Sequence, residues 1–354
     1  MKKWTKALVG SLAVMSFLFS GCGGGEKKEE KPKTAKTASS VTGLKGKDVP
    51  KVELKLSTHC TDDDANTVLA KAFAEAVSQL SNGNMKVDVY TNGQLFGQAE
   101  ALAALRQGTL DFANSDTSLF ANYTPKAAVF DLPYLFESRK QAINAVKNKE
   151  LKAKIQEAMV KASGIRPIII EPMNFRNSLV KDMNKKDFAD FKNLKMRTPE
   201  APTIIAAFKA FGANPVVIPS GEAYTAVQTG VADGLEGHAE YMVLQKFYEV
   251  AKNYVQTQHV MTFTAYSMSE KTYQKLNKDQ QEIIAKAADI ALDKFLEYTD
   301  KLFEQKYKEL EDKGVKITKT DLAPFRDAVK DYKAEFIAKN DLKELVAIID
   351  KLDK

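Results

Sequence analysis

The first half of the chain beyond residue 51 alternates between two hydrophobic patterns. Val52, Leu54 and Leu56 alternate with charged residues, which is the period of a half-buried strand. Further on, apolar residues recur at the spacing of a single helix face. The predicted strands are 52–57, 85–89 and 110–113, and the predicted helices are 68–80 and 101–105. The order strand, helix, strand, helix, strand is typical of a mostly parallel sheet with helices on both faces.

The second half repeats this organisation and adds one long helix. Two predicted strands, 168–170 and 175–180, lie on either side of residues 171–174, which we interpret as a crossing between domains. The helical pattern over 279–312 predicts a helix about 50 Å long at 1.5 Å per residue. Because that length exceeds a small domain, we expect this helix to run along both domains. Two shorter helices, at 321–338 and 341–352, complete the chain.

Two polar positions follow predicted strands of the first domain. In open α/β sheets, ligands bind beyond the carboxyl ends of the strands. His59 follows the first strand and Asp116 follows the third, so both are candidate ligand-binding residues. The alternatives are that His59 is a turn residue and that Asp116 only caps the next segment.

Arg197 occupies the corresponding position in the second half. Thr198 is a favourable N-cap and Pro199 is favoured at the first helical position, so a helix is predicted to begin there. Arg197 would then lie where a strand meets a helix N-terminus, a place that attracts anions. Its planar guanidinium can hold a carboxylate with two parallel hydrogen bonds. The alternative is an ion pair with Glu200 or Glu222.

The N-terminal segment has the features of an export signal. Three lysines precede an apolar run over residues 7–19, which is too short to span a bilayer but suits a signal peptide. The sequence FSGC (19–22) resembles a bacterial lipoprotein box, so Cys22 is the predicted lipidation site. We expect a signal peptide over 1–21 and a lipidated flexible tether over 22–51. A plain cleaved signal, with Cys22 incidental, is the alternative.

The positive charge is confined to that segment. The 354-residue chain has 52 basic and 46 acidic residues, a formal net charge of +6. Residues 1–51 hold 11 lysines and 4 acids, while the rest holds 41 basic and 42 acidic residues. A nearly neutral body argues against binding to a nucleic-acid backbone. The basic segment itself is expected to act as a solvated tail, with attraction to an anionic membrane as the alternative.

Catalytic and metal-binding motifs are not found. The sequence contains no G-x-S-x-G, H-E-x-x-H, P-loop or Rossmann glycine pattern. The three histidines, His59, His238 and His259, do not have the spacing of helical metal ligands. Cys60 has no identifiable partner base and is expected to be buried. We therefore expect a binding protein without a metal or cofactor, and not an enzyme.

Several segments of the body resemble the substrate-binding proteins of TRAP transporters, the DctP family. The most specific segments are LKMRTPEAP (194–202), FGANP (211–215), EAYTAVQTG (222–230) and VADGLE (231–236), and weaker ones are GQL (93–95), RQGTLD (106–111) and LPYLF (132–136). They occur in the family's order over about 300 residues. The resemblance implies an α/β, two-lobed, periplasmic-binding-protein-like clamshell with crossing strands and a long helix spanning both lobes. Lobe I would comprise 52–173 plus 263–302, and lobe II would comprise 174–262 plus 303–354.

The resemblance also implies a function. Such proteins bind a small organic acid outside the cytoplasm and deliver it to TRAP membrane permease subunits driven by an ion gradient. The alternative is an ABC-type or sensor-associated solute-binding lipoprotein for another small anion.

The family's ligand-binding positions can be placed on this sequence. Its principal carboxylate-binding arginine falls on Arg197 and a second arginine falls on Arg176, while His59 and Asp116 match polar residues of the other lobe. Many members have Asn where this chain has Gly237. The next candidates along the chain are His238, which is the possible substitute for that Asn, and Tyr241.

Overall fold

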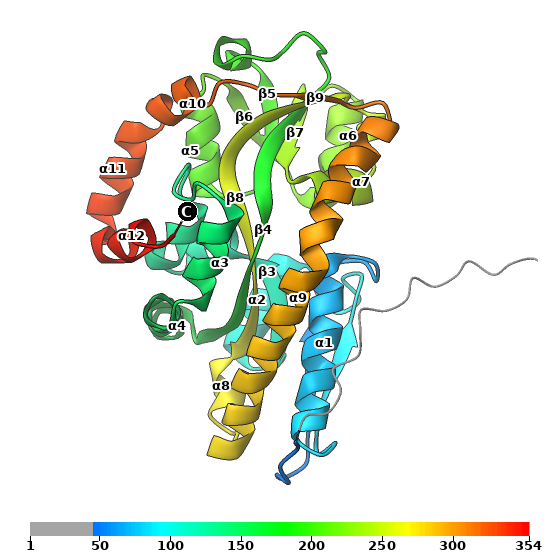
Figure 1. Cartoon of the computed structure of the whole chain (residues 1–354), viewed down its shortest axis with the longest axis vertical. Helices are drawn as coiled ribbons and strands as arrows, with labels where there is room; N and C mark the ends of the chain where they lie inside the picture. Colours follow the sequence, from blue (N-terminus) through cyan, green and yellow to red (C-terminus); the bar gives the residue numbers. More distant parts are fainter. Residues whose placement is uncertain (1–44, 354) are drawn as a thin grey trace, which may run out of the picture. The chain divides into compact units, whose positions relative to one another are not determined.

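Two long antiparallel strands, β4 (Ile165–Val180) and β8 (Asn253–Ser269), run through the middle of the sheet and connect its two halves (Figure 1). The computed structural model describes residues 45–353. The strand order is β2-β1-β3-β8-β4-β7-β5-β6, with β9 paired to β8. The other strands are β1 (Val52–Ser57), β2 (Met85–Tyr90), β3 (Phe112–Asp116), β5 (Lys195–Thr198), β6 (Asn214–Val217), β7 (Gly234–Gly237) and β9 (Lys316–Thr318).

The sheet divides into two parallel sets of strands. In the first set, which we call lobe I, β1 is parallel to both β2 and β3. In the second, lobe II, β5 is parallel to both β6 and β7. The crossing strands β4 and β8 are antiparallel to each other and belong to both lobes. This arrangement confirms the predicted α/β clamshell architecture with crossing strands.

Helices cover both faces of the sheet. The helices of lobe I are α1 (Ala65–Leu80), α2 (Gln98–Gln107), α3 (Arg139–Lys147), α4 (Lys149–Ser163) and α8 (Glu270–Tyr273). The helices of lobe II are α5 (Pro202–Ala210), α6 (Ala223–Gln228) and α7 (Ala239–Leu244). The chain ends with α9 (Lys278–Asp312), α10 (Ala323–Ala328), α11 (Lys330–Lys339) and α12 (Lys343–Asp350).

The longest helix, α9, confirms the expectation from its hydrophobic pattern. Asn277 begins it with a capping box, in which the Asn side chain and Gln280 satisfy each other's backbone N–H groups. The buried residues of α9 from Ile283 to Phe303 pack in the core of lobe I, whereas Leu310, near its end, packs in a core of lobe II. The helix therefore spans both lobes, as Figure 1 shows.

Hydrophobic side chains form one core in lobe I and two in lobe II. The lobe I core extends from Val49 through the helices and strands of the first half to the inner face of α9. The lobe II cores lie around Leu235 and around Phe208, respectively. Leu345 and Ile349 of α12 belong to the lobe I core. We therefore propose that α12 belongs with lobe I, whereas the sequence had suggested lobe II for 303–354.

The crossing between the lobes differs from the sequence expectation. The two strands predicted at 168–170 and 175–180 are one continuous strand, β4, and residues 171–174 are part of it. A register shift relative to β8 occurs between Pro172 and Phe175. Proline cannot donate to a sheet ladder and is tolerated at such bulges, which explains how Pro172 lies within a central strand.

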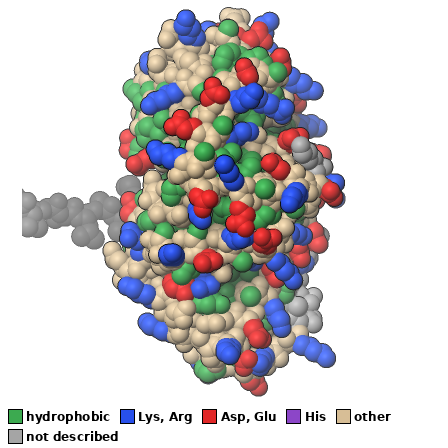
Figure 2. Space-filling model, turned by 90° about the vertical axis from the view of Figure 1, so that its left-hand side faces the viewer, with side chains coloured by type: hydrophobic (Ala, Val, Ile, Leu, Met, Phe, Trp, Pro, Cys, Tyr) green, Lys and Arg blue, Asp and Glu red, His purple; other side chains and the backbone are tan. Residues whose placement is uncertain are grey.

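Charged side chains of both signs are mixed on the surface of the body. Figure 2 shows lysine and arginine side chains intermingled with acidic ones, without a continuous basic patch on that face. Within residues 45–353, no helix combines the length and the apolar character needed to cross a bilayer. The predicted signal peptide, Cys22 and most of the tether lie outside the described residues.

Candidate functional site

The carboxyl ends of the strands from both lobes converge on the middle of β4. β3 runs antiparallel to β8 and so parallel to β4, and its last residue, Asp116, reaches Thr264, which in turn pairs with Glu171. β7 runs in the opposite direction and ends at Gly237, opposite Asn177 of β4. Ligands of α/β sheets bind at such ends, so this meeting point is the candidate site.

His59 and Asp116 are linked on the lobe I side. His59 Nε2 lies 3.1 Å from Gln98 Nε2, and Gln98 Oε1 accepts the Asp116 backbone N–H at 2.9 Å. His59 Nδ1 lies 3.2 Å from Asn114 Oδ1. Gln98 and Asn114 thus hold both predicted residues at the ends of β1 and β3, and the side chains of His59 and Asp116 are partly exposed. Cys60 is buried and burial raises the pKa of its thiol, which disfavours the reactive thiolate.

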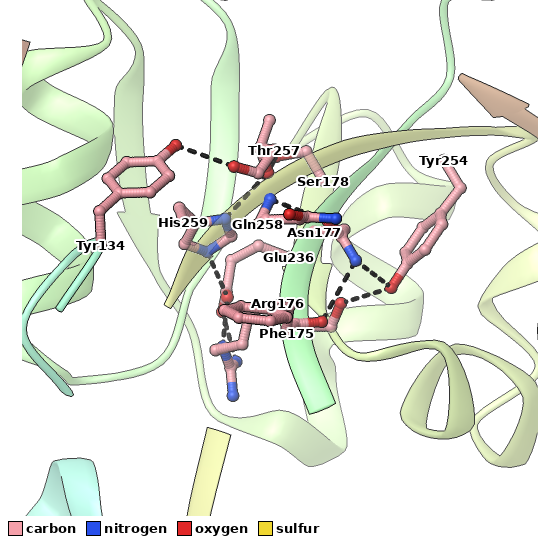
Figure 3. Close-up of polar contacts among 11 residues, drawn as sticks. Tyr134, Phe175, Arg176, Asn177, Ser178, Glu236, Tyr254, Thr257, Gln258 and His259 are labelled. Carbon is pink, nitrogen blue, oxygen red and sulfur yellow. Dashed lines mark hydrogen bonds and ion pairs between the residues drawn. The ribbon is translucent and has the colours of Figure 1, made fainter. Parts of the chain in front are cut away.

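Arg176, on β4, forms a buried bidentate ion pair with Glu236 of β7 (Figure 3). Arg176 Nε lies 2.5 Å from Glu236 Oε2, and Arg176 Nη2 lies 2.6 Å from Glu236 Oε1. His259 Nε2 also contacts Glu236 Oε2, at 3.1 Å, and its Nδ1 contacts the Thr257 hydroxyl at 2.9 Å. Arg176, Glu236 and His259 therefore connect β4, β7 and β8 where the lobes meet.

The charges of this group are strongly coupled. Burial alone would favour neutral Glu236, but Arg176 outweighs burial and holds the pKa of Glu236 far below its usual value. Burial likewise disfavours the charged form of Arg176, yet Glu236, with Asp116 adding to it, raises its pKa. Burial lowers the pKa of His259, which is therefore neutral near pH 7. Asp116 of lobe I is thus within electrostatic reach of Arg176.

His238 and Tyr241 lie at the start of α7 on the lobe II side. His238 is the N-cap residue, and its Nδ1 accepts the Tyr241 backbone N–H at 3.3 Å. Packing around the ring, together with the nearby Arg176, lowers the pKa of His238 to about 3, so the ring is neutral. The Tyr241 hydroxyl lies 2.6 Å from the Ser220 hydroxyl. Both predicted residues are therefore near Arg176, His238 as the cap of α7 and Tyr241 in contact with Ser220.

Gly237 is closely surrounded. A Cβ at this position would lie 2.9 Å from Tyr241 Cδ1 and 3.0 Å from Met242 Cε, closer than ordinary packing permits. The Gly237 carbonyl accepts a hydrogen bond from the Tyr254 hydroxyl at 3.0 Å. This chain therefore cannot carry an Asn here without displacing Tyr241, and His238 occupies the adjoining position.

Arg197 lies on β5 and differs from Arg176 in having no acidic partner in the part of the chain that the structure describes. Its Nε donates to the Ile218 carbonyl at 2.8 Å, and its exposed fraction is only 2%. Among the described residues no carboxylate pairs with it, so the alternative of an ion pair with Glu200 or Glu222 is not observed. Arg197 also shares no hydrogen bond with the Arg176 group in the described part of the chain.

The helix after Arg197 begins later than the sequence suggested. α5 starts at Pro202, with Ala201 as the N-cap residue, whereas Thr198 is the last residue of β5. A helix starting at Pro199 would place Pro202 where a backbone N–H is needed, and proline has none. The prediction of Thr198 as N-cap was therefore wrong, and Arg197 lies four residues before the cap.

The most important residues that sequence reasoning missed are Glu236, Gln98 and Glu171. Glu236 lies in the VADGLE segment, but nothing in the sequence identifies it as the partner of Arg176. No motif or hydrophobic pattern in the sequence identifies Gln98 as a site residue. No group of three or more His, Cys, Asp or Glu residues within 45–353 is arranged to hold a metal ion.

Comparison with known proteins identifies the family. Residues 56–340 match the bacterial extracellular solute-binding protein family 7, DctP. A solute-binding protein of Roseobacter denitrificans is 30% identical over 282 residues, which is 78% of this chain and 85% of the relative.

Solved structures agree with this match. A TRAP periplasmic solute-binding protein from Roseobacter denitrificans with bound L-galactonate superimposes with a TM-score of 0.76 at 27% identity, covering 85% of this chain and 98% of that one. A TRAP periplasmic solute-binding protein from Bordetella bronchiseptica, with density interpreted as pantoate, gives a TM-score of 0.78 at 28% identity, covering 86% and 100%. The chain therefore belongs to the DctP family of TRAP transporter solute-binding proteins, which are receptors and not enzymes.

Proposed function

We propose that this protein binds a small organic acid in the cleft between its lobes and delivers it to the membrane subunits of an ion-gradient-driven TRAP permease. The Roseobacter and Bordetella relatives were solved with L-galactonate and pantoate, each of which has one carboxylate. The site residues of this chain fit such a ligand in both charge and position.

The proposal depends mainly on Arg197. A buried guanidinium without a carboxylate partner is unfavourable, because burial removes water from a charge that nothing compensates. A ligand carboxylate would supply the missing charge and accept two parallel hydrogen bonds from the guanidinium nitrogens not used by Ile218. Arg197 is thus the proposed anchor of the ligand.

The other candidates would complete the site. Glu236 uses Nε and Nη2 of Arg176, which leaves Nη1 to contact the ligand. His59 and Asp116 would approach the ligand from lobe I, and His238 and Tyr241 from lobe II. Gly237 has no side chain to contact the ligand, and Tyr241 and Met242 pack against it.

Closure of the lobes would strengthen the interaction. Contacts already join the lobes: the Tyr134 hydroxyl donates to the Thr257 carbonyl at 2.8 Å, and Glu240 Oε1 accepts the Ala65 N–H at 3.4 Å. When the cleft excludes water, a charge pair inside it becomes stronger than on an exposed surface. Binding and closure are therefore expected to occur together.

The proposed location is the outer face of the cytoplasmic membrane or the periplasm, with Cys22 as the lipid anchor. Metabolic labelling with a radioactive fatty acid tests this part. The full-length chain should incorporate label and partition into the membrane fraction, whereas Cys22→Ala should do neither. Equal labelling of the two chains would exclude Cys22 as the lipidation site.

A thermal-shift screen tests the binding function. The screen uses L-galactonate, pantoate and D-glucuronate, with the corresponding neutral sugars and alcohols as controls. A ligand at 100 times its Kd stabilises the folded protein by about 2.7 kcal/mol, which raises the melting temperature measurably. Stabilisation by neutral compounds but by no acid would contradict the proposal.

A further inference from the structure

Three polar residues form one row across the strands that join the lobes. Asp116 on β3 lies opposite Thr264 on β8, and Thr264 lies opposite Glu171 on β4. Residues directly opposite each other on neighbouring strands project to the same face, with Cβ atoms about 5 Å apart. The row begins at the partly exposed Asp116 and ends at Glu171, which is completely buried.

A bulge in β4 places Arg176 on that same face. Arg176 lies opposite Val260 of β8, which is four residues from Thr264 and so has the same orientation. In a regular strand, residues five apart would project to opposite faces. The register shift between Pro172 and Phe175 adds one extra residue to β4, so Glu171 and Arg176 project to the same face. Along β8 the two positions are separated by about 13 Å at 3.3 Å per residue. A small elongated ligand can bridge that separation.

The carboxyl group of Glu171 has neither an ion-pair partner nor a hydrogen-bond partner within residues 45–353. Neither of its carboxyl oxygens has a hydrogen-bond partner among the described residues, and the Thr262 hydroxyl on the same face of β8 has none either. Burial, with Asp116 and Asp64 nearby, raises the pKa of Glu171 well above its usual value. An unsatisfied buried carboxyl group is costly, so a ligand that supplies N–H donors and positive charge would be stabilised here.

The positive charge of Arg176 is paired with Glu236, so it offsets the nearby acids only in part. Asp131 is also buried near Asp116 and Arg176, and among residues 45–353 its carboxyl oxygens accept hydrogen bonds only from the Thr117 hydroxyl. This end of the site therefore holds the carboxyl groups of Asp116, Glu171 and Asp131, whereas the other end holds the buried guanidinium of Arg197. Burial favours the neutral forms of Glu171 and Asp131 until a cation binds beside them.

We propose that Glu171 and Asp116 select a ligand that carries an ammonium group at the end opposite its carboxylate. This inference rests on the proposed binding function and specifies the class of ligand as a zwitterionic amino acid. A second carboxylate at that end would be repelled by Asp116 and would disfavour ionisation of Glu171 still further, whereas an ammonium group would favour it. A hydroxyl group could donate one hydrogen bond but would bring no positive charge to pair with either acid.

Calorimetry with three acids of equal chain length tests the selection. The probes are 5-aminopentanoate, 5-hydroxypentanoate and glutarate, repeated with the four- and six-carbon homologues. Wild type should bind an amino acid of this series at least tenfold more tightly than the hydroxy acid and the dicarboxylate of the same length. Glu171→Gln should remove that preference and Asp116→Asn should reduce it. Glu157→Gln, which changes an exposed acid of α4, should not alter it.

The outcomes separate this inference from the binding function. If a hydroxy acid or a dicarboxylate binds at least as tightly as the amino acid, or if Glu171→Gln leaves the preference intact in a folded protein, the ammonium assignment is wrong. Loss of that acid's binding in Arg197→Ala would then still support the carboxylate site. If wild type binds no acid of any length, both the inference and the proposed function fail. Circular dichroism and melting curves establish that each variant is folded.

Discussion

Arg176 and Glu236 form a two-point ion pair between β4 and β7, with donor–acceptor distances of 2.5 and 2.6 Å. The pair is almost entirely buried, with side-chain exposures of 9% and 0%. It binds the crossing strand to lobe II at the place where the lobes meet. It also neutralises one of the two arginines of the site, so Arg197 is the arginine left to bind an anion.

Removing one partner of this pair should destabilise the fold. Breaking a buried ion pair typically costs about 3–5 kcal/mol, because the remaining charge is left buried and uncompensated. We expect Glu236→Gln and Arg176→Met each to lower the free energy of unfolding by about this amount in urea denaturation. The double variant should lose less than the sum of the two.

The Arg166–Glu270 pair is the matched control. It is also bidentate, with distances of 2.5 and 2.8 Å, but its side chains are 17% and 16% exposed. Glu270→Gln should therefore cost less than Glu236→Gln, since water can solvate the remaining arginine. Equal losses at the two sites would show that burial of Arg176 is not the cause.

Gly237→Ala should destabilise the protein by displacing α7. The new Cβ would lie 2.9 Å from Tyr241 Cδ1, and inserting a methyl group into a packed site typically costs about 1–3 kcal/mol. Gly221→Ala is the control, because a Cβ there meets no atom within 4 Å. Thermal melting of the two variants compares them directly, and an unchanged melting temperature for Gly237→Ala would contradict the described packing.

The buried Asp131 should make stability fall as pH rises. Burial raises the pKa of Asp131 to about 8, from an ordinary value of 3.8. Between these values the folded state binds more protons than the unfolded state, so its contribution is complete below pH 3.8 and is lost as pH rises through 8. Each unit of raised pKa corresponds to about 1.4 kcal/mol.

Urea unfolding at several pH values checks this dependence. Asp131→Asn should have a flatter profile than wild type between pH 5 and pH 8, since its side chain does not ionise. Asp289→Asn, an exposed change on α9, should keep the wild-type slope. If Asp131→Asn and wild type had the same slope, Asp131 would not be the group that titrates.

The periodicity of apolar residues predicted most helices and strands, but not the continuity of β4 or the start of α5. The strands at β1 and β2 and the full length of α9 follow from spacings of two and of three to four apolar residues. Continuity through Pro172 could not be predicted in this way, because it depends on pairing with β8, about 90 residues later in the chain. The start of α5 was also misplaced, because Thr198-Pro199 is a stronger local signal than Ala201-Pro202.

Site residues could be predicted from the sequence where their position at the end of a strand is enough to identify them. His59 and Asp116 were identified because they occur at the ends of parallel strands. The pairing of Arg176 with Glu236 joins residues 60 positions apart, and neither residue type indicates the other in the sequence. The unpartnered state of Glu171 likewise depends on what three separate strands bring around it.

The central claim is that Arg197 holds the carboxylate, and calorimetric titration of Arg197→Ala tests it most directly. The probe is whichever of L-galactonate, pantoate, D-glucuronate or 5-aminopentanoate binds wild type most tightly, and Lys195→Ala, an exposed change on the same strand, is the control. Truncating one partner of a buried charge pair typically costs about 2–5 kcal/mol, or roughly 30- to 4,000-fold in affinity. We predict a loss in this range for Arg197→Ala, poor binding for Arg197→Lys and wild-type affinity for Lys195→Ala. Binding by a folded Arg197→Ala protein within a few-fold of wild type would contradict the claim.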